Sequence, residues 1–406
     1  MHVCCLTRIT LGHEIKGGME VHIDMLARAL ADRGHRVSIV TTSHPDGVER
    51  ESAGGVTVHY LPGCRPGKYS HEWGNATPEF LARLHQKEPI DLIWGEGAGA
   101  FYYLKWFRNP LRLPVVSFLQ GSYLGEMGTF LSLARFEGMW GQFLRFAPRR
   151  TVQYFRWDLW YTHGADAVIG ASRENAALAR WGYLLPARRV SASVNGIDPQ
   201  RFKPDAAART ALRADLGLAE TPTLLLHCSR LEPEKGPQYS IRAFAQLAGR
   251  FPDLRLLVAG NGTRRQALEA LAAGLRLGDR VMFVDHVPNQ ELPAFYNACD
   301  VFLCPTVAVE SFGITVAEAM ACGRPVVAFR RGGIQTSIDH GVNGLLVKAG
   351  DVGGLAAATA GLLADPEMRR RIGEAARRKA VEALSVERMT EDVLKVFRAL
   401  LAEERR

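Results

Sequence analysis

The chain has 406 residues, of which 47% are apolar and 23% charged, a balance typical of a soluble globular protein rather than a disordered or fibrous one. One hydrophobic core does not keep growing to this length, so we expect two domains. The net charge of +8 favours anionic partners without choosing among phosphates, acidic lipids and nucleic acid. The seven cysteines show neither C-x-x-C nor His-flanked spacing, which argues against a disulfide framework or a zinc site and favours a reducing cytoplasm.

No segment has the pattern of a membrane span or a secretory signal. The apolar run at the start of the chain is short and is interrupted by Arg8. Elsewhere no stretch reaches the roughly 18 uninterrupted apolar residues that a spanning helix needs. The sequence therefore predicts a cytoplasmic protein that is not integral to a membrane.

The first half of the chain alternates strands with helices. It opens with an apolar strand, His2 to Leu6, a loop that ends at Gly17-Gly18, and an amphipathic helix that stops at Gly34. Six further strands follow, mostly separated by helix-length stretches. These predicted strands are Val37–Thr42, Val56–Leu61, Ile90–Trp94, Leu113–Leu119, Ala167–Ala171 and Val190–Val194.

A segment rich in Gly, Asp and Pro, Asn195 to Pro204, marks the predicted domain boundary. We expect a first domain over 1–195 and a second over 196–385, with a last helix, within 386–406, that could return to the first. The second domain also alternates strands and helices. Its predicted strands are Thr223–Cys228, Leu254–Ala259, Arg280–Val284, Val301–Cys304 and Pro325–Phe329, and its predicted helices follow Pro237 and Gly313 and span Leu292–Ala298.

This alternation predicts an α/β fold of two doubly wound parallel sheets, each covered on both faces. In such sheets ligands bind beyond the carboxyl ends of the strands. Residues in the loops that follow strands are therefore the first candidates for chemistry.

The segment from Val309 to Met320 contains two glutamates eight positions apart, Glu310 and Glu318. Ser311 is a plausible helix cap, which would leave the amides of Phe312, Gly313 and Ile314 as donors for hydroxyls or phosphates. Glu318, two turns along that helix, could accept hydrogen bonds from a ribose diol. On spacing alone, a loop charge and a solvated helix residue explain the two glutamates equally simply.

Two cations lie in the loop after the first strand of the second domain, Arg230 and Lys235. They could neutralise a diphosphate, Arg230 through its planar fork and Lys235 as a point charge. Such contacts would stabilise a phosphate leaving group as its negative charge develops. A solvated basic loop beside Glu232 and Glu234 is the alternative.

The pattern Glu-x-Phe-Gly followed by a second Glu resembles the donor signature of retaining glycosyltransferases of family 4, glycosyl transferases group 1, which have the GT-B architecture. The resemblance implies that Glu310 binds the donor sugar, that Glu318 binds the nucleotide ribose, and that the loop with Arg230 and Lys235 is the pyrophosphate clamp. It also implies two Rossmann-like domains that face a cleft, retention of anomeric configuration, and no metal or other cofactor.

Other stretches extend this resemblance over nearly the whole chain. Gly17 and Gly18 match a glycine-rich loop that approaches the donor phosphate, although a glycine pair alone also fits a flexible turn. Gly260 falls in a matching Ala-Gly-Asn-Gly stretch, and the backbone around Val287 would contact the base. Gln120 stands where many relatives have a histidine that touches the donor sugar, and glutamine cannot titrate.

An aromatic and basic region extends from Phe101 to Tyr161. It holds 17 of the 35 aromatic residues of the chain, with eight Lys or Arg against three acids. Such a composition could lie at an anionic membrane surface, and an aromatic core with a basic rim or a sugar-stacking acceptor pocket fits it as well. No recognition module accompanies the basic residues, so nucleic acid is not expected as a partner.

The sequence thus predicts a metal-independent glycosyltransferase that moves a hexose from a UDP-, GDP- or ADP-sugar to a glycan, glycolipid or small-molecule acceptor, in cell-envelope polysaccharide or glycolipid assembly. Arg230, Lys235 and Glu310 are its predicted catalytic residues. The alternatives are a nucleotide-sugar epimerase or phosphorylase on the same fold, and a catalytically silent module that binds sugar nucleotides.

Overall fold

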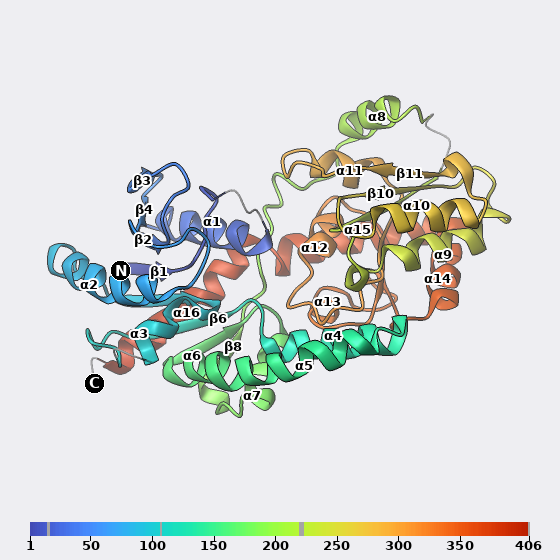
Figure 1. Ribbon diagram of the computed structural model, residues 1–406. Helices are drawn as coiled ribbons and strands as arrows, with labels where there is room; N and C mark the ends of the chain where they lie inside the picture. Colours follow the sequence, from blue (N-terminus) through green and yellow to red (C-terminus); the bar gives the residue numbers. More distant parts are fainter. Residues whose placement is uncertain (14–16, 106–107, 219–222, 405–406) are drawn as a thin grey trace. The chain divides into compact units, whose positions relative to one another are not determined.

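The computed structural model describes residues 1–13, 17–105, 108–218 and 223–404, which form two compact units (Figure 1). The first unit comprises Met1–Glu126, Ala147–Gly196 and Val386–Arg406. The second comprises Met127–Phe146 and Ile197–Ser385. Both are α/β units built on one sheet each.

The first unit has an eight-stranded sheet in the order β3-β4-β2-β1-β5-β6-β7-β8. All neighbouring strands are parallel except β3 and β4, which are antiparallel. The sequence analysis missed β3 because its four residues are all exposed and show no apolar alternation. The strands are β1 His2–Leu6, β2 Arg36–Thr41, β3 Arg50–Ala53, β4 Val56–Tyr60, β5 Leu92–Glu96, β6 Val115–Leu119, β7 Ala167–Gly170 and β8 Val190–Ala192.

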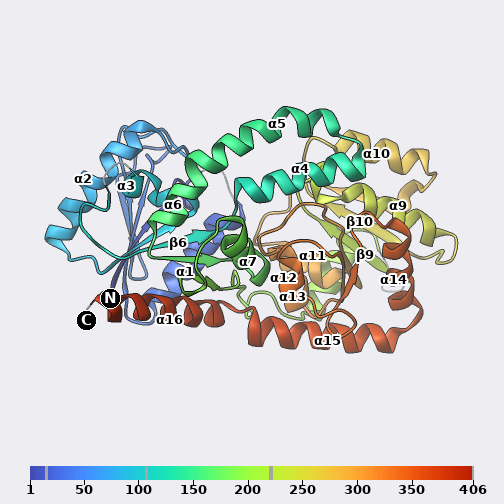
Figure 2. The same ribbon diagram turned by 90° about the horizontal axis from the view of Figure 1, so that it is seen from below.

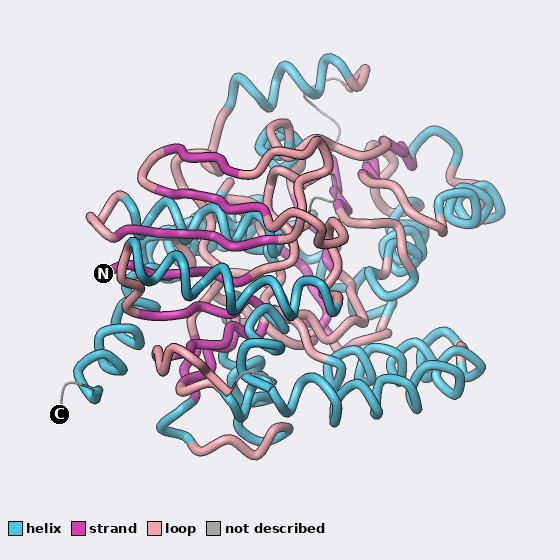
Figure 3. The backbone as a smooth tube through the Cα atoms, turned by 60° about the vertical axis from the view of Figure 1, so that its left-hand side comes forward, coloured by secondary structure: helices cyan, strands magenta, loops and turns pink. Residues whose placement is uncertain are grey.

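Helices cover both faces of this sheet, whose strands lie side by side in Figure 3. In β1, Val3 and Cys5 pack into a core with residues of α1 and α16, whereas Cys4 and Leu6 face a second core that contains residues of α2. The two-residue period of a strand and two apolar partners explain why the whole of β1 is buried.

The last helix of the chain, α16, packs beside α1 and belongs to the first unit. The helices whose residues lie wholly or partly in this unit are α1 Gly18–Ala31, α2 His71–Lys87, α3 Phe101–Lys105, α4 Tyr123–Glu137, α5 Trp140–Gln153, α6 Leu159–Gly164, α7 Arg173–Gly182 and α16 Val386–Glu404.

The second unit has a six-stranded, wholly parallel sheet in the order β11-β10-β9-β12-β13-β14. Counted along the chain from β9, this is the order 3-2-1-4-5-6 of nucleotide-binding sheets. The three residues of β14 were not predicted. The strands are β9 Leu224–Cys228, β10 Arg255–Ala259, β11 Val281–Val284, β12 Val301–Cys304, β13 Val326–Phe329 and β14 Leu345–Val347.

In the second unit, α9 packs against α14, α8 against α11, and α12 against α15. The main core combines apolar residues of β9, β10, β12 and β13 with residues of α9 and α14. The helices are α8 Ala206–Asp215, α9 Pro237–Ala248, α10 Arg265–Gly274, α11 Leu292–Ala298, α12 Ile314–Ala321, α13 Ile334–Ser337, α14 Val352–Ala364 and α15 Pro366–Ala383.

One segment of the predicted first domain, 127–146, belongs instead to the second unit. It holds most of α4 and the start of α5, which run side by side as a hairpin in Figures 1 and 2. Leu133 of α4 is buried in the core of the second unit, and Phe130 and Phe136 pack against that core. The prediction of an unbroken first domain over 1–195 was therefore wrong, because this helix buries its apolar side chains in the other core.

Candidate functional site

The predicted phosphate loop and Glu310 lie at the point where the strand order of the second sheet reverses. The reversal falls between β9 and β12, and ligands of such sheets bind in the crevice beyond the carboxyl ends of the two strands there. Arg230 and Lys235 follow β9, and Glu310 follows β12. The fold thus places these three residues at its expected ligand edge.

Lys235 and Glu310 form an ion pair across this point, with Lys235 Nζ 2.7 Å from Glu310 Oε1. The same carboxylate oxygen lies 3.1 Å from the hydroxyl of Thr306, which also lies 2.9 Å from the Glu234 carbonyl oxygen. Burial raises the pKa of Glu310, but the Lys235 ammonium and these hydrogen bonds outweigh burial and bring the pKa below its usual value. Burial likewise lowers the pKa of Lys235, and Glu310 raises it to a net value above normal. Both groups are therefore charged at neutral pH.

Arg230 remains open to solvent beside this pair. Its side chain is 70% exposed, and its guanidinium lies 3.8 Å from a carboxylate oxygen of Glu234, at the long end of an ion pair. An exposed pair of this length contributes little stability. The Arg230 fork can thus turn to an incoming anion at small cost.

A buried histidine of β9, His227, holds the start of this loop. Its Nε2 lies 2.9 Å from the Ser229 hydroxyl, which donates to the Arg230 carbonyl oxygen, and its Nδ1 lies 3.0 Å from the Ser240 hydroxyl. Burial lowers the pKa of His227 to about 3, so the ring is neutral. The Ser229 hydroxyl uses its one hydrogen for the bond to the Arg230 carbonyl oxygen, so it accepts from His227. Nε2 therefore carries the ring proton, and Nδ1 accepts from Ser240.

Gly260 follows β10 and lies against the loop after β9. Its φ is +133°, and a Cβ at this position would lie 1.9 Å from the Ser229 carbonyl oxygen. Its own amide donates to the Val284 carbonyl oxygen at 3.0 Å. Only glycine permits this close approach, which sets the position of Ser229 and hence of Arg230.

The helix after Glu310 begins later than the sequence predicts. Ser311 does not cap it, because α12 starts at Ile314 with Gly313 as its N-cap in the left-handed region, at φ +94°. Glycine adopts that conformation without the strain of a side chain, and the helix starts there. The amide of Ile314 therefore belongs to the first turn, whose N–H groups have no partner within the helix. The Phe312 side chain is buried and serves packing.

Glu318 lies one turn into α12, not two turns as predicted, and is only 6% exposed. The Tyr296 hydroxyl donates to its Oε2 at 2.7 Å, so its protein partner is Tyr296 of α11. Burial raises the pKa of Glu318 to about 7, against the smaller lowering effects of Tyr296 and Arg201. Its carboxyl group is thus divided between its neutral and ionised forms near neutral pH.

Val287, predicted to lie near the nucleotide base, follows β11 at the same edge of the sheet. Its side chain is buried in the protein. Only its backbone is left for the base contact that the family resemblance implies.

The three remaining predicted residues lie in the first unit. Gly17 is the N-cap of α1 and Gly18 its first residue. Gln120 follows β6 and exchanges two amide hydrogen bonds with Asn195, at 2.9 and 2.6 Å. This reciprocal pair fixes the orientation of the Gln120 amide.

The sequence analysis missed four residues that support the site in the second unit: Thr306, Tyr296, His227 and Thr129. The Thr129 hydroxyl accepts a hydrogen bond from the amide of Val309 at 2.9 Å, next to Glu310. Thr306 could have been found, because it is a polar residue just after strand β12, at the ligand edge. Thr129 does not follow a strand at that edge, and its helix lies within the predicted first domain.

The aromatic region divides into a core and an exposed part. Phe101, Tyr102 and Tyr103 are buried, and Trp157 stacks on Phe101 with ring centroids 4.4 Å apart. Trp106 and Phe107 lie outside the described residues. In α5, by contrast, no residue is buried.

None of the helices in the described part of the chain is long and apolar enough to cross a membrane.

Two family models match the chain, "Glycosyltransferase Family 4" over residues 16–201 and "Glycosyl transferases group 1" over residues 208–379. The D-inositol 3-phosphate glycosyltransferase 2 of Catenulispora acidiphila is 37% identical over 380 residues, which cover 88% of this chain and 84% of that protein. The chain belongs to glycosyltransferase family 4. Its resemblance to that family, first drawn from Glu310 and Glu318, is confirmed.

Two further comparisons show which other proteins the chain resembles. A GDP-mannose-dependent phosphatidylinositol monomannoside mannosyltransferase of Mycolicibacterium smegmatis is 38% identical over 193 residues, 46% of this chain and 50% of that protein. The chain thus matches only half the length of that relative. Sucrose-phosphate synthase from Thermosynechococcus elongatus has the same fold, with a TM-score of 0.80, 25% identity and 99% of both chains covered. The predicted GT-B architecture, two parallel-sheet α/β domains, is confirmed.

Proposed function

We propose that the protein is a retaining glycosyltransferase that transfers a hexose from a nucleotide-diphosphate sugar to an acceptor hydroxyl. The Lys235–Glu310 ion pair beside the exposed Arg230, at the reversal point of the second sheet, carries this proposal. Membership of family 4 and the GDP-mannose dependence of one relative support it.

In the proposed reaction the donor diphosphate binds to Arg230 and Lys235. The bond between the anomeric carbon and the phosphate oxygen breaks, and its electron pair goes to that oxygen. The two cations stabilise the charge that develops there. The acceptor oxygen forms the new bond on the same face of the sugar, and its proton passes to the departing diphosphate. Glu310 accepts hydrogen bonds from hydroxyl groups of the sugar and does not move a proton.

Glu318 would hold the ribose of the donor. Its Oε2 accepts from Tyr296, and Oε1 remains to accept a ribose hydroxyl. No metal is needed in this scheme, because Arg230 and Lys235 carry the positive charge at the phosphates.

The decisive experiment incubates the protein with UDP-, GDP- and ADP-hexoses and a panel of acceptors, including inositol phosphate, phosphatidylinositol mannoside and short glycans. We expect transfer with one donor. The anomeric configuration of the new linkage, determined by NMR, should be the same as that of the donor. Transfer should persist in EDTA. Inversion of the linkage would rule out the proposed same-face step, and conversion of the donor without an acceptor would identify an epimerase.

We also propose that α5 binds an anionic membrane surface. Apolar residues follow one another at about four-residue steps along its exposed side, among them Trp140, Leu144 and Val152, and Leu144 is 68% exposed. Arg145 and Arg149 are exposed next to them. A helix with this pattern lies in the interface between lipid headgroups and acyl chains.

Flotation with phosphatidylglycerol vesicles tests the membrane proposal. The wild type should bind in a salt-sensitive way, and Leu144→Asp should abolish binding. Trp181→Asp serves as a control, since Trp181 is equally exposed on α7. Equal binding by all three proteins would show that α5 does not make the contact.

A further inference from the structure

A charged cavity lies at the edge of the second sheet opposite to the predicted donor residues. It has a volume of about 570 Å³ and is lined by residues just before β12 and β13, such as Asp300 and Arg324. Because all six strands are parallel, this is the amino-terminal edge, and the predicted donor residues lie at the other edge. The five arginines that line it are Arg324, Arg369, Arg370, Arg377 and Arg378.

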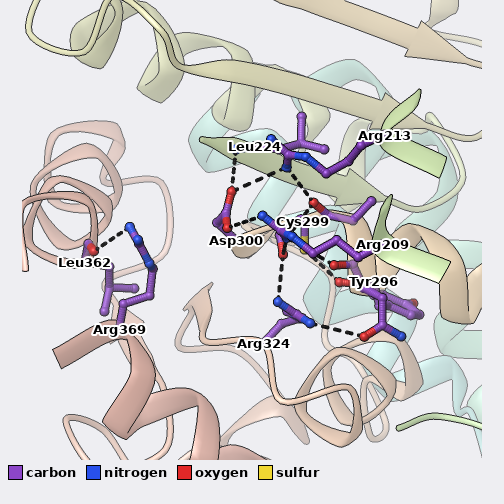
Figure 4. A network of polar contacts seen from close by, with 11 residues as sticks. Arg209, Arg213, Leu224, Tyr296, Cys299, Asp300, Arg324, Leu362 and Arg369 are labelled. Carbon is purple, nitrogen blue, oxygen red and sulfur yellow. Dashed lines mark hydrogen bonds and ion pairs between the residues drawn. The ribbon is translucent and has the colours of Figure 1, made fainter. Parts of the chain in front are cut away.

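The carboxylates in this pocket are already paired. Asp300 lies 3.0 Å from Arg209 and 3.7 Å from Arg213, and it accepts the Leu224 amide at 2.8 Å (Figure 4). Glu374 is paired with Arg370 at 2.5 Å. Neither acid is therefore left to balance the other four arginines.

Two of these four donate only to neutral oxygens. Arg324 donates to the Cys299 carbonyl at 3.3 Å and to the Asn297 side chain at 3.1 Å, and Arg369 donates to the Leu362 carbonyl at 3.3 Å (Figure 4). The Nε of Arg324 is buried and has no acceptor among the described residues. Both guanidiniums keep their full positive charge.

The other two arginines, Arg377 and Arg378, also have no carboxylate partner among the described residues. Arg377 donates to the carbonyl oxygens of Phe202, Ala321 and Pro199, at 2.6 to 2.9 Å. Arg378 is exposed and makes no ion pair within the described chain. Carbonyl oxygens orient a guanidinium without neutralising it, so four positive charges meet in one concave site.

We propose that this arginine pocket binds a phosphorylated small molecule. Guanidinium forks recognise phosphate oxygens with two parallel hydrogen bonds each. The volume is within the range of small-molecule sites, and three prolines, Pro204, Pro325 and Pro366, form apolar walls. A merely solvated basic face would not hold Arg324 and Arg377 in place by five hydrogen bonds within a cavity.

The test uses the full-length chain with Arg230→Ala and Lys235→Ala, which removes both cations of the donor loop. Titration calorimetry measures the binding of two probes, inorganic pyrophosphate and ribose 5-phosphate. We expect binding with one site per chain. Adding Arg369→Gln and Arg378→Gln should weaken it at least about tenfold, since each charge-assisted contact is worth about one power of ten.

The control adds Arg371→Gln instead, since Arg371 is exposed on the same helix, α15, and does not line the pocket. It should leave the affinity unchanged. Circular dichroism and Tm confirm that each variant is folded, and Arg378→Gln alone serves if the double change is not tolerated. Absence of binding, or equal binding by the pocket and control variants, would overturn the proposal. Preferential binding of phosphatidic acid vesicles or of a DNA duplex through the same arginines would overturn it as well.

Discussion

The two edges of the second sheet differ in whether their positive charges have carboxylate partners. At the carboxyl edge, Lys235 is neutralised by Glu310 at 2.7 Å, and Glu234 stands near Arg230. At the amino edge, Arg324, Arg369 and Arg377 have only neutral partners, and Arg378 makes no ion pair within the described chain. A balanced edge suits a ligand with both hydroxyls and phosphates, because carboxylates and cations each find a partner. An unbalanced edge suits a ligand that is mainly anionic.

The largest expected effect is on kcat, which should depend on the carboxyl edge of the second sheet and not on its amino edge. Lys235→Ala should lower kcat by about two to three orders of magnitude, because it removes a cation that stabilises the leaving group. Arg369→Ala at the amino edge should leave kcat within about twofold. Steady-state kinetics measures both kcat values, with the donor and acceptor that the transfer assay identifies. Near-normal transfer by the Lys235 variant would remove the phosphate clamp from the mechanism.

The next effect concerns the stability of the carboxyl edge. Gly260→Ala should lower the free energy of unfolding by about 3 to 5 kcal/mol, because its Cβ would collide with the Ser229 carbonyl oxygen at an unfavourable φ. Gly274→Ala is the matched control, since Gly274 ends α10 and a Cβ added there would meet nothing within 4 Å. That change should be neutral or stabilise by up to about 1 kcal/mol. Urea unfolding monitored by fluorescence compares the two, and equal losses would show that the approach to Ser229 is not tight.

These contrasts also show what the sequence could predict. The apolar runs of β1, β9 and β12 are buried on both faces, and such runs identify central parallel strands from the sequence alone. The loops after those strands were then the right places to search. Glu310 and Lys235 became candidates in this way, although they are 75 residues apart and no spacing rule predicts their contact.

The predictions that failed depend on tertiary contacts. Ser311 has the side chain of a helix cap, but the close fit of Gly313 in the left-handed region decided where α12 begins. Leu133 lies in a helix within the predicted first domain, and only its packing assigns it to the core of the second unit. The sequence analysis made no prediction for the four arginines of α15 that line the pocket, because only the loop with Arg324 completes it.

A smaller effect distinguishes the edges by their response to pH. The pKa of Glu318 is about 7, so the fraction of ionised carboxylate rises through neutral pH, whereas arginines stay charged. Donor affinity should therefore fall about tenfold from pH 8 to pH 6, because a protonated Glu318 accepts the ribose hydroxyl poorly. Glu318→Gln, which keeps an acceptor for Tyr296, should make donor affinity nearly independent of pH. A thermal-shift titration at each pH measures this affinity, and an unchanged pH profile in the variant would assign the titration to another group.

The raised pKa of Glu318 changes folding stability with pH in the direction opposite to its effect on donor affinity. The folded-state pKa of Glu318 lies above its unfolded value near 4.5, so its contribution to stability is complete below pH 4.5 and is lost as the pH rises through 7. The wild type should lose up to about 3 kcal/mol of unfolding free energy relative to Glu318→Gln over this range. Urea unfolding at pH 4.5 and pH 8 measures the difference, and a constant difference would show that burial does not raise this pKa.

The smallest expected effect tests whether the α4 segment supports the carboxyl edge. Thr129→Val keeps the shape of the side chain but removes the hydroxyl that accepts the Val309 amide. Loss of one hydrogen bond should cost about 1 kcal/mol, and because Val309 precedes Glu310, kcat should fall more than the affinity for the donor. Ser132→Ala is the companion change, since Ser132 lies one turn further along α4 and accepts a hydrogen bond from Arg331, not from the Glu310 loop. A loss of stability in both variants with a loss of kcat only in Thr129→Val would show that α4 positions the loop of Glu310. Unchanged kcat in both would limit this helix to packing.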